Sequence, residues 1–194
     1  MLRARTGIHI LFLSLLTLFG FMAPAYADSY NDTVQRFHKA NQSKDFFKDA
    51  YGFAVFPTVG KAGIGLGGAY GEGRVYRGLK HVGDTTLTQL SFGFQLGGQA
   101  YSQIIFFKDK RAFDEFTSGN FEFSAQASAA VITAGATAEA STKGVSASGG
   151  LTQDSNETAG RYYKGMATFI IVKGGLMYEV AISGQKFSYT PKGE

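Results

Sequence analysis

The segment from Gly52 to Tyr76 constrains the fold more than any other part of the chain, because seven glycines lie between positions 60 and 73. A short apolar run before them ends at Pro57, which cannot donate a ladder hydrogen bond and so belongs at a strand end or edge. In an extended strand, glycines at alternating positions leave one face without side chains, and another layer can then pack against bare backbone. The sequence therefore predicts a glycine-rich strand, with structural glycines at Gly63, Gly65, Gly67, Gly68, Gly71 and Gly73.

Three of these glycines also match the spacing of a dinucleotide-binding loop, Gly63-x-Gly65-x-x-Gly68. That loop requires a helix that begins at its last glycine and an acidic residue further on that holds a ribose. Residues 69–76 instead contain two more glycines and β-forming side chains, which do not begin a helix. We therefore favour the glycine-rich strand, and we expect no cofactor.

The N-terminus has the features of an export signal. Two arginines precede an apolar run from Ile8 to Phe21, and a small-residue site that ends at Ala27 follows the run. The run is short for a membrane span, and the order of the three parts is typical of a signal peptide. We predict a signal peptide at residues 1–27, cleaved after Ala27, and a single domain at residues 28–194. An uncleaved N-terminal anchor is the alternative.

Composition narrows the class of protein further. The chain has no cysteine, which excludes disulfides, thiolate metal sites and a lipid-modified cysteine. The net charge is +4 with 19 basic and 15 acidic residues, and removing Arg3 and Arg5 leaves 17 against 15, or about +2. This balance does not favour a nucleic-acid partner. The predicted location is the periplasm or the exterior of the cell.

Apolar periodicity predicts three short helices. The first two precede the glycine-rich strand and are expected to cover one end of a sheet rather than to face a membrane. The third has Asp109 as its expected N-cap and Gly119 as its stop. Their expected positions are Tyr30 to Phe37, Lys44 to Tyr51 and Lys110 to Ser118.

The remaining segments predict strands. Residues 89–96 alternate between polar and apolar side chains, and we expect Leu90, Phe92, Phe94 and Leu96 to face the core. The sequence Lys173-Gly174-Gly175 predicts the turn of a hairpin. About eight strands in total indicate an α+β, mainly β fold. Its expected form is a twisted antiparallel sheet, open or partly closed into a barrel, with two short N-terminal helices and one short internal helix.

Residues 121–151 are rich in alanine and serine. Strands of such residues bury little apolar area, at about 25 cal/mol per Å². Either another layer packs closely against them, or they line a cavity that a ligand fills. The sequence leaves both alternatives open.

The segment Ala50 to Tyr76, AYGFAVFPTVGKAGIGLGGAYGEGRVY, resembles the opening signature of the SYLF domain family. The resemblance continues through Phe92 to Tyr101, the apolar run Ile104 to Phe107, and Ala112 to Phe121. It departs at Lys173 to Val180, where eukaryotic members carry a Gly-Leu-Phe-Ala-Gly type of segment. The resemblance implies membrane binding, because eukaryotic members bind phosphoinositide membranes and fungal members also bind actin. For an exported protein, we expect anionic phospholipid as the partner and not actin.

Catalytic groupings are not evident. The chain beyond the signal peptide has two histidines, His38 and His81, which are far apart in the sequence. No nucleophile elbow, phosphate-binding loop or metal-binding helix motif occurs. We predict a non-enzymatic protein without a metal.

The basic residues support an anionic lipid site. One cluster, which also includes His81, surrounds the glycine-rich strand and its turn, and a second precedes the third helix; Tyr70, Tyr76, Phe106 and Phe107 lie nearby in the sequence. Cations beside aromatic side chains suit the headgroup layer of a membrane. The predicted lipid-binding residues are Lys61, Arg74, Arg77, Lys80, Lys108, Lys110 and Arg111. Two alternatives remain: an envelope protein that self-associates or binds a protein partner through an open sheet edge, and a carrier of an acyl chain.

Overall fold

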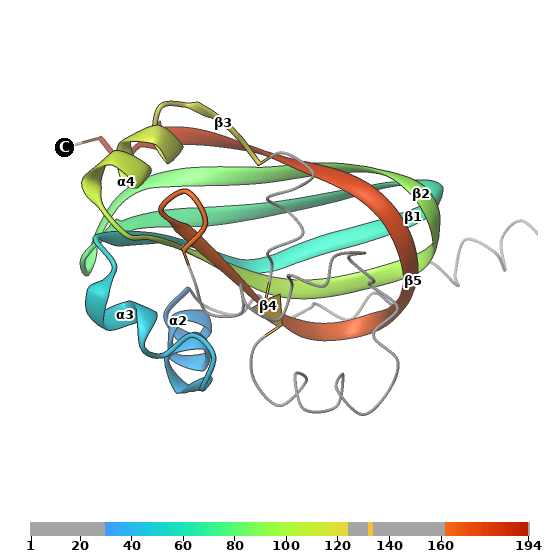
Figure 1. Ribbon diagram of the computed structural model, residues 1–194, viewed down its shortest axis with the longest axis horizontal. Helices are drawn as coiled ribbons and strands as arrows, with labels where there is room; N and C mark the ends of the chain where they lie inside the picture. Colours follow the sequence, from blue (N-terminus) through green and yellow to red (C-terminus); the bar gives the residue numbers. More distant parts are fainter. Residues whose placement is uncertain (1–29, 124–131, 134–161, 194) are drawn as a thin grey trace, which may run out of the picture.

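The computed structural model describes residues 30–123, 132–133 and 162–193 (Figure 1). The predicted signal peptide and most of the alanine- and serine-rich segment lie outside the described residues. The helices are α2 (Tyr30–Lys39), α3 (Phe46–Asp49) and α4 (Lys110–Phe116). The strands are β1 (Gly52–Arg77), β2 (Lys80–Phe107), β3 (Asn120–Phe123), β4 (Ile132–Thr133) and β5 (Met166–Pro191).

The described strands form one sheet in the order β1-β2-β5-β3, and β4 also pairs with β5. The pairs along the main path are antiparallel, whereas β4 runs parallel to β5. The mainly β, antiparallel fold class predicted from the sequence is confirmed, and the sheet is open rather than closed into a barrel.

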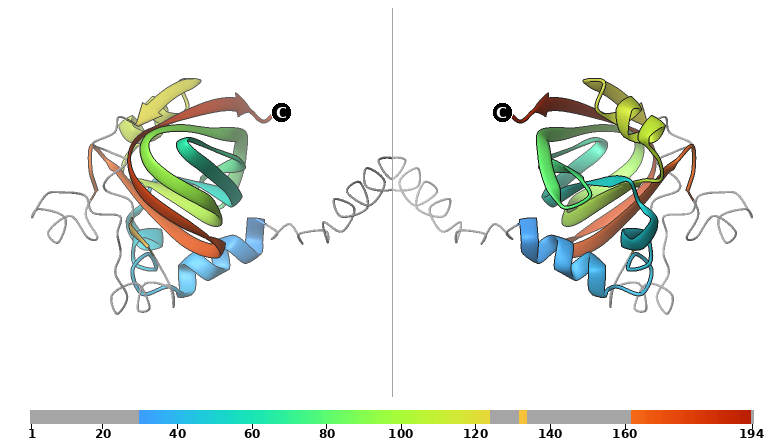
Figure 2. Two further views of the ribbon diagram at one scale, coloured as in Figure 1. Left: turned by 90° about the vertical axis from the view of Figure 1, so that its right-hand side faces the viewer. Right: turned by 90° about the vertical axis from the view of Figure 1, so that its left-hand side faces the viewer.

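Strands β1 and β2 form one long ribbon that folds back on itself. They pair from Gly52 opposite Phe107 to Arg77 opposite Lys80, with a register shift between Ile64 and Leu66. The two ends of β1 nevertheless lie together, because the Gly78 amide, just beyond its last residue, donates to the Tyr51 carbonyl, just before its first, at 3.3 Å. We call residues 64–66 of β1 and 92–96 of β2 the bend, and residues 77–80 the tip. Figures 1 and 2 show the curved ribbon with the bend and the tip at opposite ends.

The glycines allow the two halves of the folded ribbon to approach each other. A Cβ atom on Gly73 would lie 2.6 Å from the Phe56 ring, and one on Gly71 would lie 2.7 Å from Val59 Cγ2. At the bend, Gly65 has a φ of 73°, a backbone conformation that glycine adopts without strain. The second half of β1 therefore presents bare backbone to the side chains of the first half.

The other predicted structural glycines also lie at or near the bend. The Gln95 side chain occupies the space beside Gly63 and Gly67. A Cβ atom on Gly63 would lie 3.0 Å from Gln95 Cδ, and one on Gly67 would lie 2.7 Å from the same atom. Gly68 is less restricted, because its nearest neighbour would be the Gln89 carbonyl at 3.4 Å.

Two apolar cores lie on opposite faces of the sheet. The inner core fills the space between the two halves of the ribbon and is closed by α4, whose Asp109 cap accepts a hydrogen bond from the Ala112 amide at 2.9 Å. The outer core lies beneath α2 and α3. The largest inner residues are Phe56, Leu87, Ile105, Phe107, Phe116 and Phe187, and the largest outer ones are Phe37, Phe53, Ile104, Phe106 and Phe169.

The prediction of a hairpin turn at Lys173-Gly174-Gly175 is wrong. β5 runs through these residues without a break, with Gly174 opposite Ala100 and Val172 opposite Tyr101. The register shifts by one residue here, which makes a β-bulge with Lys173 as its extra residue. The Lys173 ammonium group donates to Thr58 Oγ1 at 3.1 Å. Glycines within a strand mark a bulge or a bend as well as a turn. Several glycines that were predicted to end strands lie inside long strands. The described residues therefore form five strands rather than the predicted eight or so.

Candidate functional site

The strand at the bend has its polar side chains inside and its apolar side chains outside. Gln95 is 2% exposed and Ser91 is fully buried, whereas Leu90, Phe92 and Leu96 are exposed. The prediction that these apolar residues face the core is therefore wrong, and nothing is described for the side chain of Phe94. The inversion needs a local cause, because leaving large apolar side chains in water is unfavourable.

Hydrogen bonds explain why polar groups occupy the inner side. The Gln95 amide donates to the carbonyls of Gly65 at 3.2 Å and Ser91 at 3.0 Å, and it accepts from the Ser91 hydroxyl at 2.8 Å. The space for this side chain exists because Gly63 and Gly67 have none. The buried amide is thus satisfied, and it links the two strands where the ribbon curves most.

The outer side of the bend and the strand residues next to it carry a group of exposed apolar side chains, which we call the bend surface. Cross-strand pairing places Ile64 opposite Leu96 and Leu66 opposite Phe92. Each member is between 54% and 81% exposed. Groups of exposed apolar side chains are typical of surfaces that contact a protein or a membrane. Its members are Ile64, Leu66, Tyr70, Leu90, Phe92 and Leu96.

The sequence contains a signal for the bend surface. Ile64 and Leu66 alternate with glycines that were predicted to present bare backbone to another layer. If the glycine face is the packed face, the apolar residues between the glycines must lie on the outer face. The same rule then places their antiparallel partners, Leu96 and Phe92, outside as well.

Of the predicted lipid-binding cations, the structure brings most to the end of the molecule that holds the tip. Arg77 and Lys80 flank the turn of the β1–β2 hairpin, whose Leu79 is 97% exposed. Among the described residues, neither cation has a carboxylate within ion-pair distance. An exposed leucine between two such cations is the most accessible part of this end.

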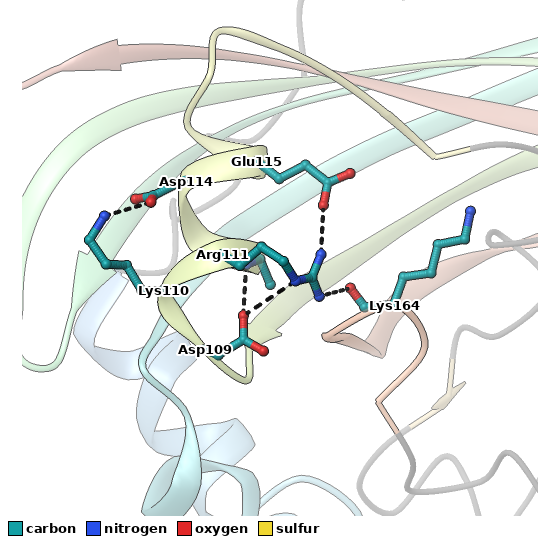
Figure 3. A network of polar contacts seen from close by, with 7 residues as sticks. Asp109, Lys110, Arg111, Asp114, Glu115 and Lys164 are labelled. Atoms are coloured by element: carbon teal, nitrogen blue, oxygen red, sulfur yellow. Dashed lines mark hydrogen bonds and ion pairs between the residues drawn. The ribbon is translucent and has the colours of Figure 1, made fainter.

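The cations of α4 lie near the tip but are paired with acidic groups (Figure 3). Lys110 Nζ lies 2.6 Å from Asp114 Oδ2, and Arg111 donates to Glu115 at 3.3 Å and to the Lys164 carbonyl at 3.2 Å. Asp114 raises the pKa of Lys110 through this hydrogen bond and its charge, while Arg77 opposes the rise. Lys108 differs, because its ammonium group faces the Tyr162 ring, 5.9 Å from the centroid.

Two further predicted cations have other surroundings. Arg74 lies 3.8 Å from Asp84 Oδ1 and 4.1 Å from the centre of the Tyr30 ring, so it fastens α2 to the sheet. Lys61 lies opposite Gln99, near the bend and not at the tip. The structure therefore does not unite the predicted set in one site.

The predicted aromatic partners of the cations are mostly internal. Phe106 and Phe107 are fully buried, which contradicts their expected contact with headgroups. Tyr76 is half-buried and stacks on Phe53 with ring centroids 5.0 Å apart. Tyr70 alone of the four is exposed, and it belongs to the bend surface.

The burial of the Tyr162 hydroxyl in the outer core, near Lys108, can be tested through its pKa. The hydroxyl is buried without a partner in the described structure, and burial, with a smaller contribution from Asp49, raises its pKa to about 12. Because the folded chain holds this proton more tightly than the unfolded chain does, the associated stability is complete below pH 10. It is lost as the pH rises towards 12. We expect Tyr162→Phe to unfold at a higher urea concentration than the original chain, by a margin that is larger at pH 11 than at pH 9. An equal margin at both pH values would contradict the assignment.

In the described ranges, no cluster of three or more histidine or acidic side chains has a geometry suitable for a metal ion. The same ranges contain no helix with the length and hydropathy needed to cross a membrane.

The chain is a mainly β module built on a sharply bent, open antiparallel sheet. Its two distinctive surface features are the exposed apolar residues of the bend surface and the cations of the tip. The chain belongs to the Ysc84 family, which includes the SYLF domain, and the resemblance seen in the sequence is thereby confirmed. The family profile, described as "Las17-binding protein actin regulator", matches residues 88–190. This family is associated with lipid and actin binding.

One curated relative is similar over most of the chain. It is "Beta cell expansion factor A" of Aeromonas veronii, with 31% identity over 158 residues. The alignment covers 79% of this chain and 51% of the relative, so the chain spans about half the length of that protein. No solved structure matches the chain.

Proposed function

We propose that this chain is a non-enzymatic lipid-binding protein of the cell envelope that seats its bend surface in the outer layer of a phospholipid bilayer. The observation that carries this proposal is the inverted strand, with Gln95 and Ser91 inside and Leu90, Phe92 and Leu96 in contact with water. The fold keeps these apolar groups outside at a cost in solvation, and contact with a lipid would offset that cost. The envelope location depends on the predicted signal peptide.

The shape of the bend surface favours a bilayer over a protein partner. The bend surface faces away from the inner side that holds Gln95 and Ser91, and Figures 1 and 2 show that the ribbon itself is strongly curved. The interface of a bilayer deforms around inserted side chains, so a convex surface needs no preformed concave partner there. Leucine, isoleucine and phenylalanine are also the residues that interfacial proteins insert to the depth of the acyl chains.

An acyl-chain carrier is less well supported. The two best-defined pockets in the described part of the chain have volumes of about 130 and 170 Å³. Ordinary ligand pockets occupy about 300–1,000 Å³. The alanine- and serine-rich segment that first suggested a carrier lies outside the described residues.

The proposal is tested by co-sedimentation of the purified protein with phosphatidylcholine vesicles. Leu66→Ser combined with Phe92→Ser removes two half-exposed apolar groups, each worth about 1–2 kcal/mol on transfer from water. We expect the partition coefficient of the double variant to fall about 30-fold or more, and binding by the original chain to depend only weakly on salt.

Thr88→Ser is the matched control, because Thr88 lies on β2 beside Tyr70 and is also exposed. This change removes one methyl group from the same strand and is expected to leave binding nearly unchanged. Unaltered binding by the double variant would contradict the bend surface as the lipid contact. A stable dimer in solution that the double variant converts to a monomer would favour self-association instead.

A further inference from the structure

The tip and the bend surface face in opposite directions. The bend surface includes residues on both halves of the ribbon. Ile64 and its partner Leu96 lie on the first half of β1 and the paired part of β2, and Tyr70 and Leu90 lie on the other half. The bend surface therefore faces away from the two halves of the ribbon, which meet again at the tip. Eleven residues of β1 separate Leu66 from Arg77, which corresponds to about 35 Å of extended strand. Figure 1 shows this separation along the long axis of the molecule.

Charge at the tip is complementary to an anionic surface. Arg77 and Lys80 of the tip, and Lys108 and Lys192 beside it, are exposed, and among the described residues none has a carboxylate within ion-pair distance. Two neighbouring acidic groups are already paired, Asp114 with Lys110 and Asp84 with Arg74 and His81. The Lys192 amide donates to the Val82 carbonyl at 2.9 Å, which holds the end of β5 beside the tip.

Leu79 adds an apolar group in the turn between Arg77 and Lys80. It is the most exposed of the large apolar side chains in the described structure, at 97%. The turn holds it there because Gly78, with a φ of 56°, adopts the left-handed conformation that a tight hairpin requires. An apolar side chain with flanking cations suits the boundary between headgroups and acyl chains in an anionic bilayer.

We propose that the tip is a second membrane contact, specific for anionic phospholipid, and that the chain bridges two bilayers, one at the bend and one at the tip. This inference rests on the proposed function, because it requires the bend surface to hold the first bilayer. A planar membrane that covers the bend surface is separated from the tip by about four Debye lengths at physiological salt. The cations of the tip therefore add little to binding at the first bilayer and remain available to a second one.

Bridging is measured by light scattering of vesicles that contain phosphatidylcholine and phosphatidylglycerol, mixed with the purified protein. We expect the original chain to aggregate these vesicles, and high salt to reverse the aggregation without releasing the protein from them. Vesicles of phosphatidylcholine alone are expected to bind the protein but not to aggregate.

The informative variant combines Arg77→Glu, Leu79→Ser and Lys80→Glu, all at exposed positions. Each lost cation weakens binding to an anionic surface about fivefold, so we expect aggregation to fall at least 25-fold at equal protein concentration. Co-sedimentation with phosphatidylcholine vesicles should not change. Lys39→Glu with Lys44→Glu is the charge-matched control at exposed positions on α2 and just after it, and should aggregate vesicles as the original chain does.

Aggregation that persists in the triple variant would overturn the tip as the second contact. Binding to anionic vesicles without aggregation by the original chain would overturn bridging alone and leave the proposed function intact. Failure of the original chain to bind phosphatidylcholine vesicles would overturn both.

Discussion

Replacing Gly73 with alanine is expected to lower the free energy of unfolding by about 3 kcal/mol, a large effect for the addition of one methyl group. The new Cβ would lie 2.6 Å from two carbons of the Phe56 ring and 2.9 Å from the Val55 carbonyl oxygen. Phe56 is fully buried in the inner core, so its ring has no free space into which to move. The two halves of the ribbon would have to separate, which would open the inner core.

Thermal unfolding followed by circular dichroism measures this effect. A change of about 3 kcal/mol corresponds to a fall of about 6–12 °C in Tm for a chain of this size. Gly60→Ala is the control, because a Cβ on Gly60 of the same strand would meet nothing within 4 Å. We expect that variant to unfold within about 2 °C of the original chain. Equal losses in the two variants would contradict the close approach of the two halves.

Replacing Phe106 with alanine is expected to cost about 3–5 kcal/mol. Phe106 is fully buried and lies at the centre of the outer core, where it contacts the rings of Phe46, Phe47 and Phe169 with centroids between 4.7 and 5.9 Å away. Phe46 and Phe47 belong to α3 and Phe169 to β5, so the ring joins a helix to the sheet. Its removal leaves a cavity that neither element can fill without moving.

The same position separates a structural role from a role in lipid contact. Phe106→Leu keeps most of the volume and should cost about 1.5 kcal/mol or less. Because the side chain is fully buried, we expect vesicle binding by Phe106→Leu to match that of the original chain. A folded Phe106→Leu variant that had lost vesicle binding would restore the headgroup role that the sequence suggested. Denaturant unfolding and co-sedimentation together give both results.

The helices were predictable because local signals determine them. Asp109 caps α4, Gly119 follows it with a φ of 105°, and Phe113 and Phe116 pack inward, as their spacing predicted. The predicted span of α3 was too long at both ends and that of α4 at its C-terminal end, because local signals define helix boundaries only to within one or two residues. The mainly β class also followed from alternation and from β-forming residues.

The bend was not predictable from local pattern alone. Alternation fixes which residues share a face but not which face is buried, and at residues 89–96 the usual assumption failed. The buried side is decided by Gly63 and Gly67, which lie on another strand and make room for Gln95. The continuity of β5 through Gly174 likewise depends on its pairing with Ala100.

The sequence identified which residues are cationic, but not which of them lack an acidic partner and can therefore contact an anionic surface. Lys110 and Arg111 have acidic partners one helical turn along α4, whereas Arg77 and Lys80 have none among the described residues. Sequence spacing of four on a helix could have indicated the first case. The convergence of α4 and the tip could not be predicted, because it depends on the folding of the ribbon.

The strand order has a consequence for the newly made chain. Strand β2 lies between β1 and β5, yet 58 residues separate its last residue, Phe107, from Met166 at the start of β5. At about 5–20 residues per second, a ribosome needs about 3–12 s to make that interval. Meanwhile β1 and β2 can close from their two-residue turn within microseconds. For several seconds the hairpin therefore presents an uncovered edge along β2, and during that period a holding chaperone would protect the nascent protein from aggregation.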